Sequence, residues 1–427
     1  MLSRFLLRVA YRHLGAMTTV PFKIVFKNGD TFENRPSEAP AFTIIYKRIA
    51  AQWATLLFDA VGLADHYFRQ NLDIEGDITQ MTILRGQVAK HPHAATHNPI
   101  NMLRNRWHEL RHTNRVIAHA KHNAMYHYNR GTGMFQQYLD PTMTYTCAYW
   151  KEGTTTLVQA QRDKLEHVCR KLRLQPGETL VDIGSGWGSL LFHAYERYGT
   201  LGTNVSPTPN QNRAMAEEIK KRGLEETIKI QEADFRETKG VFDKYASLGV
   251  YEHAGYNQLE LWIKAMAECT KEGGIGVLHF IGNIRRDLDS TGYLIRNYIF
   301  PGGYLPGLAE TIEIMDKYDL EILDVENLRR HYAPTLRAWA ENFDIHWDTI
   351  HALDPKKYDE YFRRMWRFYL YSCSGVFLEE GARVGLFQIV FSKGRTKNYP
   401  MTRDFLYPSG MQESATPSLI TLEEAAR

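Results

Sequence analysis

The sequence predicts an α/β protein in which a Rossmann-like domain follows a smaller, mostly helical N-terminal domain. From about residue 158 to about residue 391, apolar strands alternate with helical segments, as in a mostly parallel sheet covered by helices on both faces. A glycine-rich turn follows the first of these strands, at residues 184–188. The chain has 427 residues, which is long enough for two domains.

The N-terminal part combines short strand signals with helical ones. Residues 22–26 lead into Lys27-Asn28-Gly29-Asp30, which is a hairpin turn sequence, and residues 41–46 indicate another short strand. Residues 50–84 carry a mostly helical pattern. We therefore expect an N-terminal domain over residues 1–120, a larger domain over 121–395 and a loose polar tail over 396–427.

Two basic helical stretches lie in the N-terminal part. In the first, apolar residues recur at helical spacing beside a separate arginine stripe: Leu2, Phe5, Leu6 and Val9, with Arg4, Arg8 and Arg12. Packing on its own domain, contact with a membrane surface and an organelle transit peptide all remain open. Residues 101–121 form the second stretch, which is a solvated face or a patch that faces phospholipid.

Composition narrows the classes of function. The formal net charge is only +3, which argues against a nucleic-acid partner. Four scattered cysteines show no zinc or redox spacing, so we expect reduced thiols in a cytoplasmic protein. The histidines within residues 87–98 have no acid or cysteine beside them, so we expect a solvated loop and no metal site. No apolar run reaches the ~18 residues of a membrane span.

The strongest motif runs from Val181 to Gly188 and consists of Val-Asp-Ile-Gly-Ser-Gly-Trp-Gly. Its glycines allow a tight turn and close approach of the backbone to a ligand. A dinucleotide fingerprint would place its third glycine at position 189, where this chain has Ser189. That departure, with Asp182 just before the turn, favours S-adenosylmethionine over NAD.

Two later strand ends carry further candidate cofactor ligands. Asn204 and Gln211 stand where many nucleotide-binding folds use an acid, and they can hold ribose hydroxyls by neutral hydrogen bonds. Asp234 can accept a hydrogen bond from an adenine amino group, and Phe235 can flank the ring. A helix-capping role for Asp234 is a serious competing explanation.

At this point the residues resemble the cyclopropane-fatty-acyl-phospholipid synthase family, which includes the mycolic acid cyclopropane synthases. The resemblance covers about residues 126–393 and is much fainter before residue 121. It rests on separated motifs: His127-Tyr128, the segment Met-Thr-Tyr-Thr-Cys-Ala-Tyr-Trp at 143–150, the glycine-rich turn, Gly-Val-Tyr-Glu-His-Ala-Gly at 249–255, Leu-His-Phe-Ile-Gly at 278–282, and Tyr-Ile-Phe-Pro-Gly-Gly at 298–303.

The resemblance implies an S-adenosylmethionine-dependent methyltransferase domain after an N-terminal lipid- or membrane-binding domain. The implied cofactor ligands, besides Asp182, are Tyr145, Thr146, Gly184, Gly186, Asn204, Gln211 and Asp234. Residues in the positions where the family holds bicarbonate are Cys147, Glu252, His279, Ile281 and Tyr332. Cys373 matches a cysteine proposed as catalytic in the family, although its apolar surroundings favour a buried thiol.

Some positions depart from the family pattern. The family usually has Asp at Asn129, Asn-Asp at Thr132-Gly133 and Cys at Ser185, and the loop 206–211 contains two prolines. These departures concern the shape of the cofactor and acyl openings, and therefore the substrate. The bicarbonate residues are all present.

The implied reaction adds a methylene group from S-adenosylmethionine to a cis double bond. Methyl transfer leaves a carbocation, which requires a dry site and is stabilised by aromatic faces; Tyr149, Phe280 and Tyr298 are candidates. Ring closure then needs a base within reach of the new methyl group. Bicarbonate would be that base, with donors from His279, Tyr332 and backbone N–H groups, while Glu252 accepts its hydroxyl or orients His279.

We therefore expect an enzyme that forms cyclopropane rings on unsaturated acyl chains of membrane phospholipids, peripheral on the membrane, with a homodimer implied by the resemblance. A relative that makes a methyl or methylene branch is a close alternative. A methyltransferase for a soluble small molecule is a further one. A membrane-binding module without catalysis is the least favoured, because the glycine turn and the Glu252, His279 and Tyr332 set are present.

Overall fold

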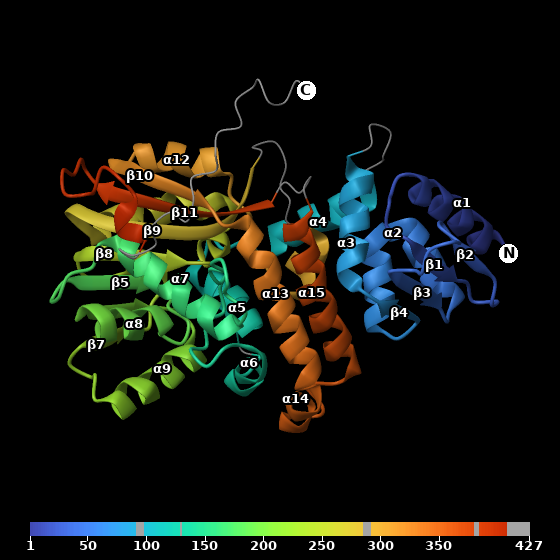
Figure 1. Cartoon of the computed structure of the whole chain (residues 1–427), viewed down its shortest axis with the longest axis horizontal. Helices are drawn as coiled ribbons and strands as arrows, with labels where there is room; N and C mark the ends of the chain where they lie inside the picture. Colours follow the sequence, from blue (N-terminus) through green and yellow to red (C-terminus); the bar gives the residue numbers. More distant parts are fainter. Residues whose placement is uncertain (91–97, 129, 285–291, 380–383, 408–427) are drawn as a thin grey trace, which may run out of the picture.

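Buried apolar runs form the strands of a central seven-stranded sheet with the order β10-β11-β9-β8-β5-β6-β7 (Figure 1). This computed structural model describes residues 1–90, 98–128, 130–284, 292–379 and 384–407. The strands are β5 (Thr179–Ile183), β6 (Leu201–Val205), β7 (Ile228–Gln231), β8 (Phe242–Leu248), β9 (Thr270–Asn283), β10 (Leu320–Asn327) and β11 (Val384–Lys393). All neighbours pair in parallel except β11, which is antiparallel to β9 and β10. The predicted Rossmann-like fold is confirmed.

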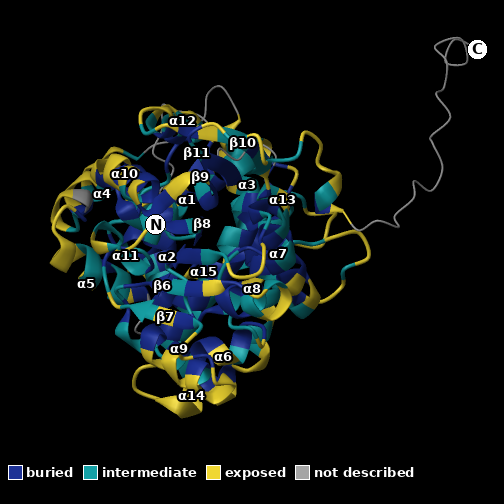
Figure 2. Ribbon diagram, turned by 90° about the vertical axis from the view of Figure 1, so that its left-hand side faces the viewer, coloured by how far each residue is buried: buried dark blue, intermediate teal, exposed yellow. Residues whose placement is uncertain are grey.

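Helices cover both faces of this sheet. On one face, α7 (Leu157–Leu172), α8 (Ser189–Tyr198) and α9 (Pro209–Arg222) bury one apolar cluster, and on the other α10 (Leu259–Cys269) and α12 (Leu308–Asp316) bury a second. Figure 2 shows α7 and α8 on the opposite side of the sheet from α10. This arrangement leaves the carboxyl ends of the parallel strands as the edge where ligands bind in such folds.

Between β10 and β11 the chain leaves the sheet as three helices: α13 (Arg329–Ile345), α14 (Trp347–Leu353) and α15 (Glu360–Leu378). In Figure 1, α13 and α15 stand between the sheet and the N-terminal part. Trp339 and Trp366 are completely buried within this layer. The layer therefore joins both parts of the molecule in one apolar core.

The N-terminal part contains a four-stranded sheet of order β2-β1-β3-β4 beside helices. The predicted hairpin is confirmed as β1 (Phe22–Val25) paired with β2 (Thr31–Glu33), and the next predicted strand is β3 (Phe42–Tyr46). The helical expectation for residues 50–84 is wrong at β4 (Leu72–Gly76), which separates α2 (Ile49–Phe68) from α3 (Ile78–Ala89). Only Leu72 and Ile74 are buried there, and so short an alternation is hidden between two helices.

The first basic helix is α1 (Leu2–Ala16). The face that it packs against the core is not the one that carries its apolar stripe. Its predicted apolar stripe is exposed, while Leu7 and Tyr11 face the core. Arg4 pairs with Asp30, and the guanidinium of Arg8 donates to the Thr31 carbonyl at 2.6 Å. These contacts hold α1 against the hairpin that follows it.

The second basic stretch forms two helices, α4 (Pro99–Arg111) and α5 (Ile117–Tyr128). Since α5 runs across residue 120, the expected boundary falls inside a helix. His91, His93, His97 and Asn129 lie outside the described residues. In the part of the chain that is described, no helix is long and apolar enough to cross a bilayer.

Long-range contacts fix the N-terminal part and the tail to the rest of the molecule. The Arg364 guanidinium on α15 bonds to the Asp73 carboxylate at 2.8 Å and to the Leu72 carbonyl at 3.2 Å. The tail was expected to be loose from residue 396, but it is attached as far as Tyr407, through Arg403, which bonds to Asp324, and the buried Leu406. Polar composition alone does not reveal such anchors.

Replacement of Gly375 by leucine should destabilise the contact between α15 and α3. A Cβ atom at Gly375 would lie 2.7 Å from the Thr79 carbonyl oxygen, so a large side chain would separate the two helices. We expect a loss of about 1–3 kcal/mol in the free energy of unfolding, measured by urea denaturation. Gly133→Ala is the control: its Cβ would meet Leu353 at 3.4 Å, and alanine favours the helix. Equal stability of both variants would contradict the close packing of these helices.

Candidate active site

The glycine-rich turn connects β5 to α8 at the carboxyl edge of the sheet. Gly184 has a φ of +80°, and a Cβ atom there would lie 2.8 Å from Val250, so only glycine fits. The turn places its backbone beside the loop that follows β8. A ligand cavity opens at this point, as expected for the carboxyl ends of parallel strands.

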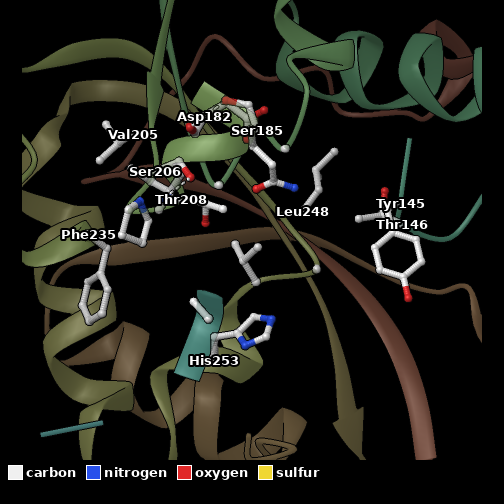
Figure 3. Close-up of a pocket in the computed structure, with 18 of the residues that line it drawn as sticks. Tyr145, Thr146, Asp182, Ser185, Val205, Ser206, Thr208, Phe235, Leu248 and His253 are labelled. Carbon is white, nitrogen blue, oxygen red and sulfur yellow. Dashed lines mark hydrogen bonds between the residues drawn. The ribbon is translucent and has the colours of Figure 1, made fainter. Parts of the chain in front are cut away.

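Most of the predicted cofactor residues line this one cavity: Tyr145, Thr146, Asp182, Gly184, Gly186, Gln211 and Asp234. Figure 3 shows Asp182, near the end of β5, beside Ser185 on the turn, with Phe235 and Tyr145 on opposite sides of the cavity. Asn204 lies behind the turn instead. Its side chain is fully buried, accepts from Ser185 Oγ at 2.7 Å and donates to Asn212 at 3.0 Å. It therefore supports the turn through Ser185, which occupies one of the positions that depart from the family pattern.

Asp182 is a buried carboxyl group that faces a cavity. Burial raises its pKa to about 7, although Lys164 nearby acts to lower it. Its Oδ1 atom is buried without a hydrogen-bond partner among the described residues. A ligand with positive charge would supply the missing interaction, which fits the sulfonium and amino groups of S-adenosylmethionine.

Lys164 was missed by the sequence interpretation. It lies on α7, is only 1% exposed and donates from Nζ to Thr146 Oγ1 at 2.9 Å. Burial lowers its pKa to about 8. A lysine inside a helix that is otherwise amphipathic gives no signal of this role, because its partners come from the distant segments around Thr146 and Asp182.

Asp234 has the helix-capping role that was weighed against cofactor binding, and it also lies at the cavity. It caps the short helix 235–237, where it accepts from the Arg236 backbone at 3.1 Å, and it bonds to the Arg236 guanidinium at 2.6 Å. It also lines the cavity. Phe235 packs on Trp262 with ring centres 4.3 Å apart, so one wall of the cavity is aromatic. Binding of adenine there stays a prediction.

Glu252 forms the centre of a second group of predicted residues. Its Oε1 accepts from the Ile281 backbone N–H at 2.5 Å, and its Oε2 is buried with no partner among the described residues. Burial raises the pKa of this carboxyl to about 7. Tyr332 lies within electrostatic reach of Glu252, Cys147 and Cys373, and burial raises its pKa. The structure thus brings together residues that are up to 226 positions apart in the chain, from Cys147 to Cys373.

His279 is oriented by Gln388, whereas Glu252 was considered for this role from the sequence. Gln388 Nε2 donates to its Nδ1 at 3.0 Å, whereas Glu252 bonds to the backbone of Ile281. Burial lowers the pKa of His279 to about 3, so the ring is neutral. With Nδ1 accepting, the neutral ring carries its proton on Nε2 and can donate from there. Glu252 therefore does not orient His279 in this structure. The other role considered for Glu252, accepting the hydroxyl of bicarbonate, stays a prediction.

The two cysteines of the site are protonated thiols. Cys147 is 1% exposed, and burial raises its pKa. Burial also raises the pKa of Cys373 to about 12. Neither environment favours a thiolate, which supports the buried-thiol interpretation of Cys373 over a nucleophile.

Aromatic side chains surround Tyr145, but they are mostly not the predicted ones. Its ring centre lies 5.0 Å from that of Trp339 and 5.1 Å from that of Phe135, and its hydroxyl lies 3.2 Å from the hydroxyl of Tyr369. The predicted candidates lie elsewhere: Phe280 packs on Tyr251 and Phe387, Tyr298 donates to Asp65 at 2.8 Å, and Tyr149 stacks on His167 and His331. The helices α6 (Thr132–Tyr138), α13 and α15 provide this wall.

Among the described residues, no group of three or more histidine, cysteine or acidic side chains is arranged to hold an ion. All four cysteines are free.

Comparison with known proteins agrees with this geometry. The family model for mycolic acid cyclopropane synthetase matches residues 116–388. A "Probable fatty acid methyltransferase" of Pseudomonas putida is 31% identical over 91% of this chain and 96% of its own. The cyclopropane-fatty-acyl-phospholipid synthase of Escherichia coli K12 is 36% identical over 63% of this chain and 67% of its own.

Among solved structures, mycolic acid cyclopropane synthase CmaA1 complexed with SAH and CTAB is 26% identical, with a TM-score of 0.58, over 64% of this chain and 98% of that one. The matched region contains the glycine-rich turn, Glu252 and Tyr332. This chain therefore belongs to the mycolic acid cyclopropane synthetase family and is an S-adenosylmethionine-dependent methyltransferase.

Proposed function

We propose that the enzyme transfers a methylene group from S-adenosylmethionine to the cis double bond of an unsaturated phospholipid acyl chain, which forms a cyclopropane ring. The observation that carries the proposal is the buried Glu252 carboxyl, whose Oε2 has no partner among the described residues. Val250 and His253, on either side of it in sequence, line the cofactor cavity. These neighbours support a role for Glu252 in the removal of a proton next to the bound methyl donor.

S-adenosylmethionine and bicarbonate have separate roles in this proposal. S-adenosylmethionine, when bound, supplies the electrophilic methyl group, and bicarbonate, when bound, would supply the base. Glu252 would accept the hydroxyl of such an anion, Tyr332 and His279 Nε2 would donate to it, and these groups would share a proton and titrate as a unit. Orphaned Glu252 Oε2 fits a ligand that donates a hydrogen bond.

The surrounding aromatic side chains suit a carbocation. The faces of Tyr145, Phe135 and Trp339 lie together in the buried core, where they exclude water and offer negative potential to a positive centre. Ring closure breaks one C–H bond of the transferred methyl group and uses that electron pair for the second C–C bond. The proton passes to the base, and the overall charge is conserved.

A methyl- or methylene-branched product is the second candidate. The Pseudomonas relative, which matches the chain over 91% of its length, is named a fatty acid methyltransferase without mention of a ring. Both outcomes begin with the same methyl transfer to one carbon of the double bond. Direct loss of a proton from the new methyl group closes the ring, whereas a hydride shift along the chain before that loss gives a methylene branch. A saturated methyl branch requires a hydride donor in addition. The position of the base relative to the new methyl group decides between them.

Glu252→Gln should abolish product formation while cofactor binding remains. The amide keeps the shape but cannot share the proton, so we expect turnover to fall by about 100-fold or more. The measurement is gas chromatography with mass spectrometry of fatty acids after incubation with S-adenosylmethionine, bicarbonate and dioleoyl phosphatidylglycerol vesicles. Wild-type enzyme should add one carbon as a ring; a product that fragments as a branched chain would replace the proposal by the second candidate. Ring formation by the variant at the wild-type rate would refute the role of Glu252.

Asp182→Asn should give the complementary result, with weakened cofactor binding. The pKa of about 7 means that Asp182 becomes protonated as the pH falls below 7 and then loses its attraction for a cationic ligand. We expect the dissociation constant of wild type for S-adenosylmethionine to rise by up to about tenfold per pH unit below pH 7. Isothermal titration calorimetry between pH 5.5 and 8.5 measures this dependence. The Asn variant should bind weakly with a flat profile; a flat profile in wild type would show that Asp182 does not bind the positive charge.

A further inference from the structure

Helix α4 exposes a row of large apolar side chains that no other part of the described chain covers. Ile100, Leu103, Trp107 and Leu110 follow one another at helical spacing, with exposed fractions of 45%, 72%, 59% and 65%. Exposed rows of this kind on one helix are characteristic of interaction surfaces. The neighbouring Val116 and Ile117, at the start of α5, are also exposed.

Positive charge accompanies the apolar row. Residues 99–121 contain the basic side chains Arg104, Arg106, Arg111, Arg115 and Lys121 and only one acidic residue, Glu109. Arg106, Arg111 and Arg115 are exposed. The Arg111 guanidinium lies 4.5 Å from the centre of the Trp107 ring, so a cation and an apolar side chain share one spot on the surface. This pairing is what the boundary between lipid head groups and acyl chains requires.

The apolar row is held rigidly on the protein. Asn98 Nδ2 donates to the Leu57 carbonyl at 2.8 Å, and Asn101 Nδ2 donates to the Phe58 carbonyl at 2.9 Å. The Arg104 guanidinium lies 4.4 Å from the centre of the Tyr293 ring. Figure 2 shows α4 and α5 on the outer flank of the molecule. The row therefore points outward from a fixed helix, and Leu57, which is itself 50% exposed, extends it onto α2.

The same helical pair also forms part of the cofactor cavity. Asn114, between α4 and α5, lines the cavity together with Ala120 and Ala124 of α5. Asn114 Nδ2 donates to the carbonyl of His253, the residue that follows Glu252, at 2.8 Å. One side of this pair thus touches the reaction site, while the other side carries the apolar row.

We propose that the outer face of the α4–α5 pair is the surface by which the enzyme docks on a bilayer of anionic phospholipid. The apolar row enters the head-group and acyl boundary, and the arginines contact phosphates. A bilayer at this face lies one helix away from the cofactor cavity, which gives an acyl chain a short path. The reason for docking, delivery of an acyl chain, depends on the proposed function. The assignment of the surface depends only on the apolar row and the charges beside it.

Helix α1 is the competing surface. Its apolar stripe is exposed too, but Arg4 and Arg8 are engaged by Asp30 and the Thr31 carbonyl. Two of the three arginines of α1 are therefore turned toward the protein's own hairpin, and α1 contributes no residue to the cofactor cavity. These differences favour the α4–α5 face.

The test compares two double variants of the full-length protein. Leu103→Glu with Leu110→Glu places charges in the row, and Ile345→Glu with Leu353→Glu is the matched control, since these residues are 73% and 50% exposed on α13 and α14. Binding is measured by co-sedimentation with vesicles of phosphatidylglycerol or phosphatidylcholine. We expect the row variant to bind phosphatidylglycerol vesicles at least about tenfold more weakly, with the control unchanged. Wild type should prefer phosphatidylglycerol and lose affinity as salt is raised.

The outcomes separate this proposal from the proposed function. Unchanged vesicle binding by the row variant would overturn the docking surface, even if the enzyme forms rings. Conversion of a dimer to a monomer by the same variant, seen by light scattering with vesicle binding intact, would assign the face to a second copy and also overturn it. Weaker binding with unchanged melting temperature and calorimetric affinity for S-adenosylmethionine supports the surface, even if wild type makes no cyclopropane. Wild type that binds no vesicles would refute it.

Discussion

Burial of two carboxyl groups at the carboxyl edge of the central sheet is the constraint that the rest of the site has to satisfy. Asp182 and Glu252 each have an oxygen without a hydrogen-bond partner among the described residues, and each has a pKa raised to about 7 by burial. A buried carboxylate without compensation is unfavourable by several kcal/mol. Lys164 compensates Asp182 in part through its charge, and the Ile281 N–H compensates Glu252. Both groups are left ready for a ligand.

The helices between β10 and β11 make this burial possible. They carry Tyr332 and Trp339 on α13 and Tyr369 on α15 to the side of Tyr145, and on its other side α15 packs against α2 and α3. The N-terminal part is therefore joined to the site through a continuous core. Truncation of that part would expose the outer face of α15, although the residues of α2 and α3 lie away from the cofactor cavity.

Local patterns explain why much of the sheet and the cofactor cavity could be predicted from the sequence. The glycine turn directly follows β5, Asp182 lies in the last residues of that strand, and Asp234 comes shortly after β7. The ends of parallel strands meet at one edge of the sheet. Asn204 lies near the end of β6, but its side chain is directed behind the turn, where it accepts a hydrogen bond from the Ser185 hydroxyl. Which side of a turn a residue supports depends on its neighbours in space.

Other features depend on contacts between distant segments and could not be predicted. Gln388 reaches His279 only because β11 pairs antiparallel with β9. The apolar stripe of α1 is exposed because Leu7 and Tyr11, on another face of the helix, pack against the core. Helical spacing alone does not determine which face packs. Strand β4 is too short to show its period beside two long helices. In each case the sequence pattern is compatible with more than one arrangement, and tertiary packing selects one.

An enzyme that generates a carbocation on a membrane lipid has to admit an apolar chain and exclude water at the same opening. In our proposals the α4–α5 pair meets both requirements. Its inner side lines the cofactor cavity, and its outer side is apolar and basic. A bilayer against that outer side would displace water from its exposed apolar side chains. The hydrogen bond from Asn114 to the His253 carbonyl joins this pair to the loop that carries Glu252. The loop that carries Glu252 is therefore positioned by the same pair of helices that our proposal places against the bilayer.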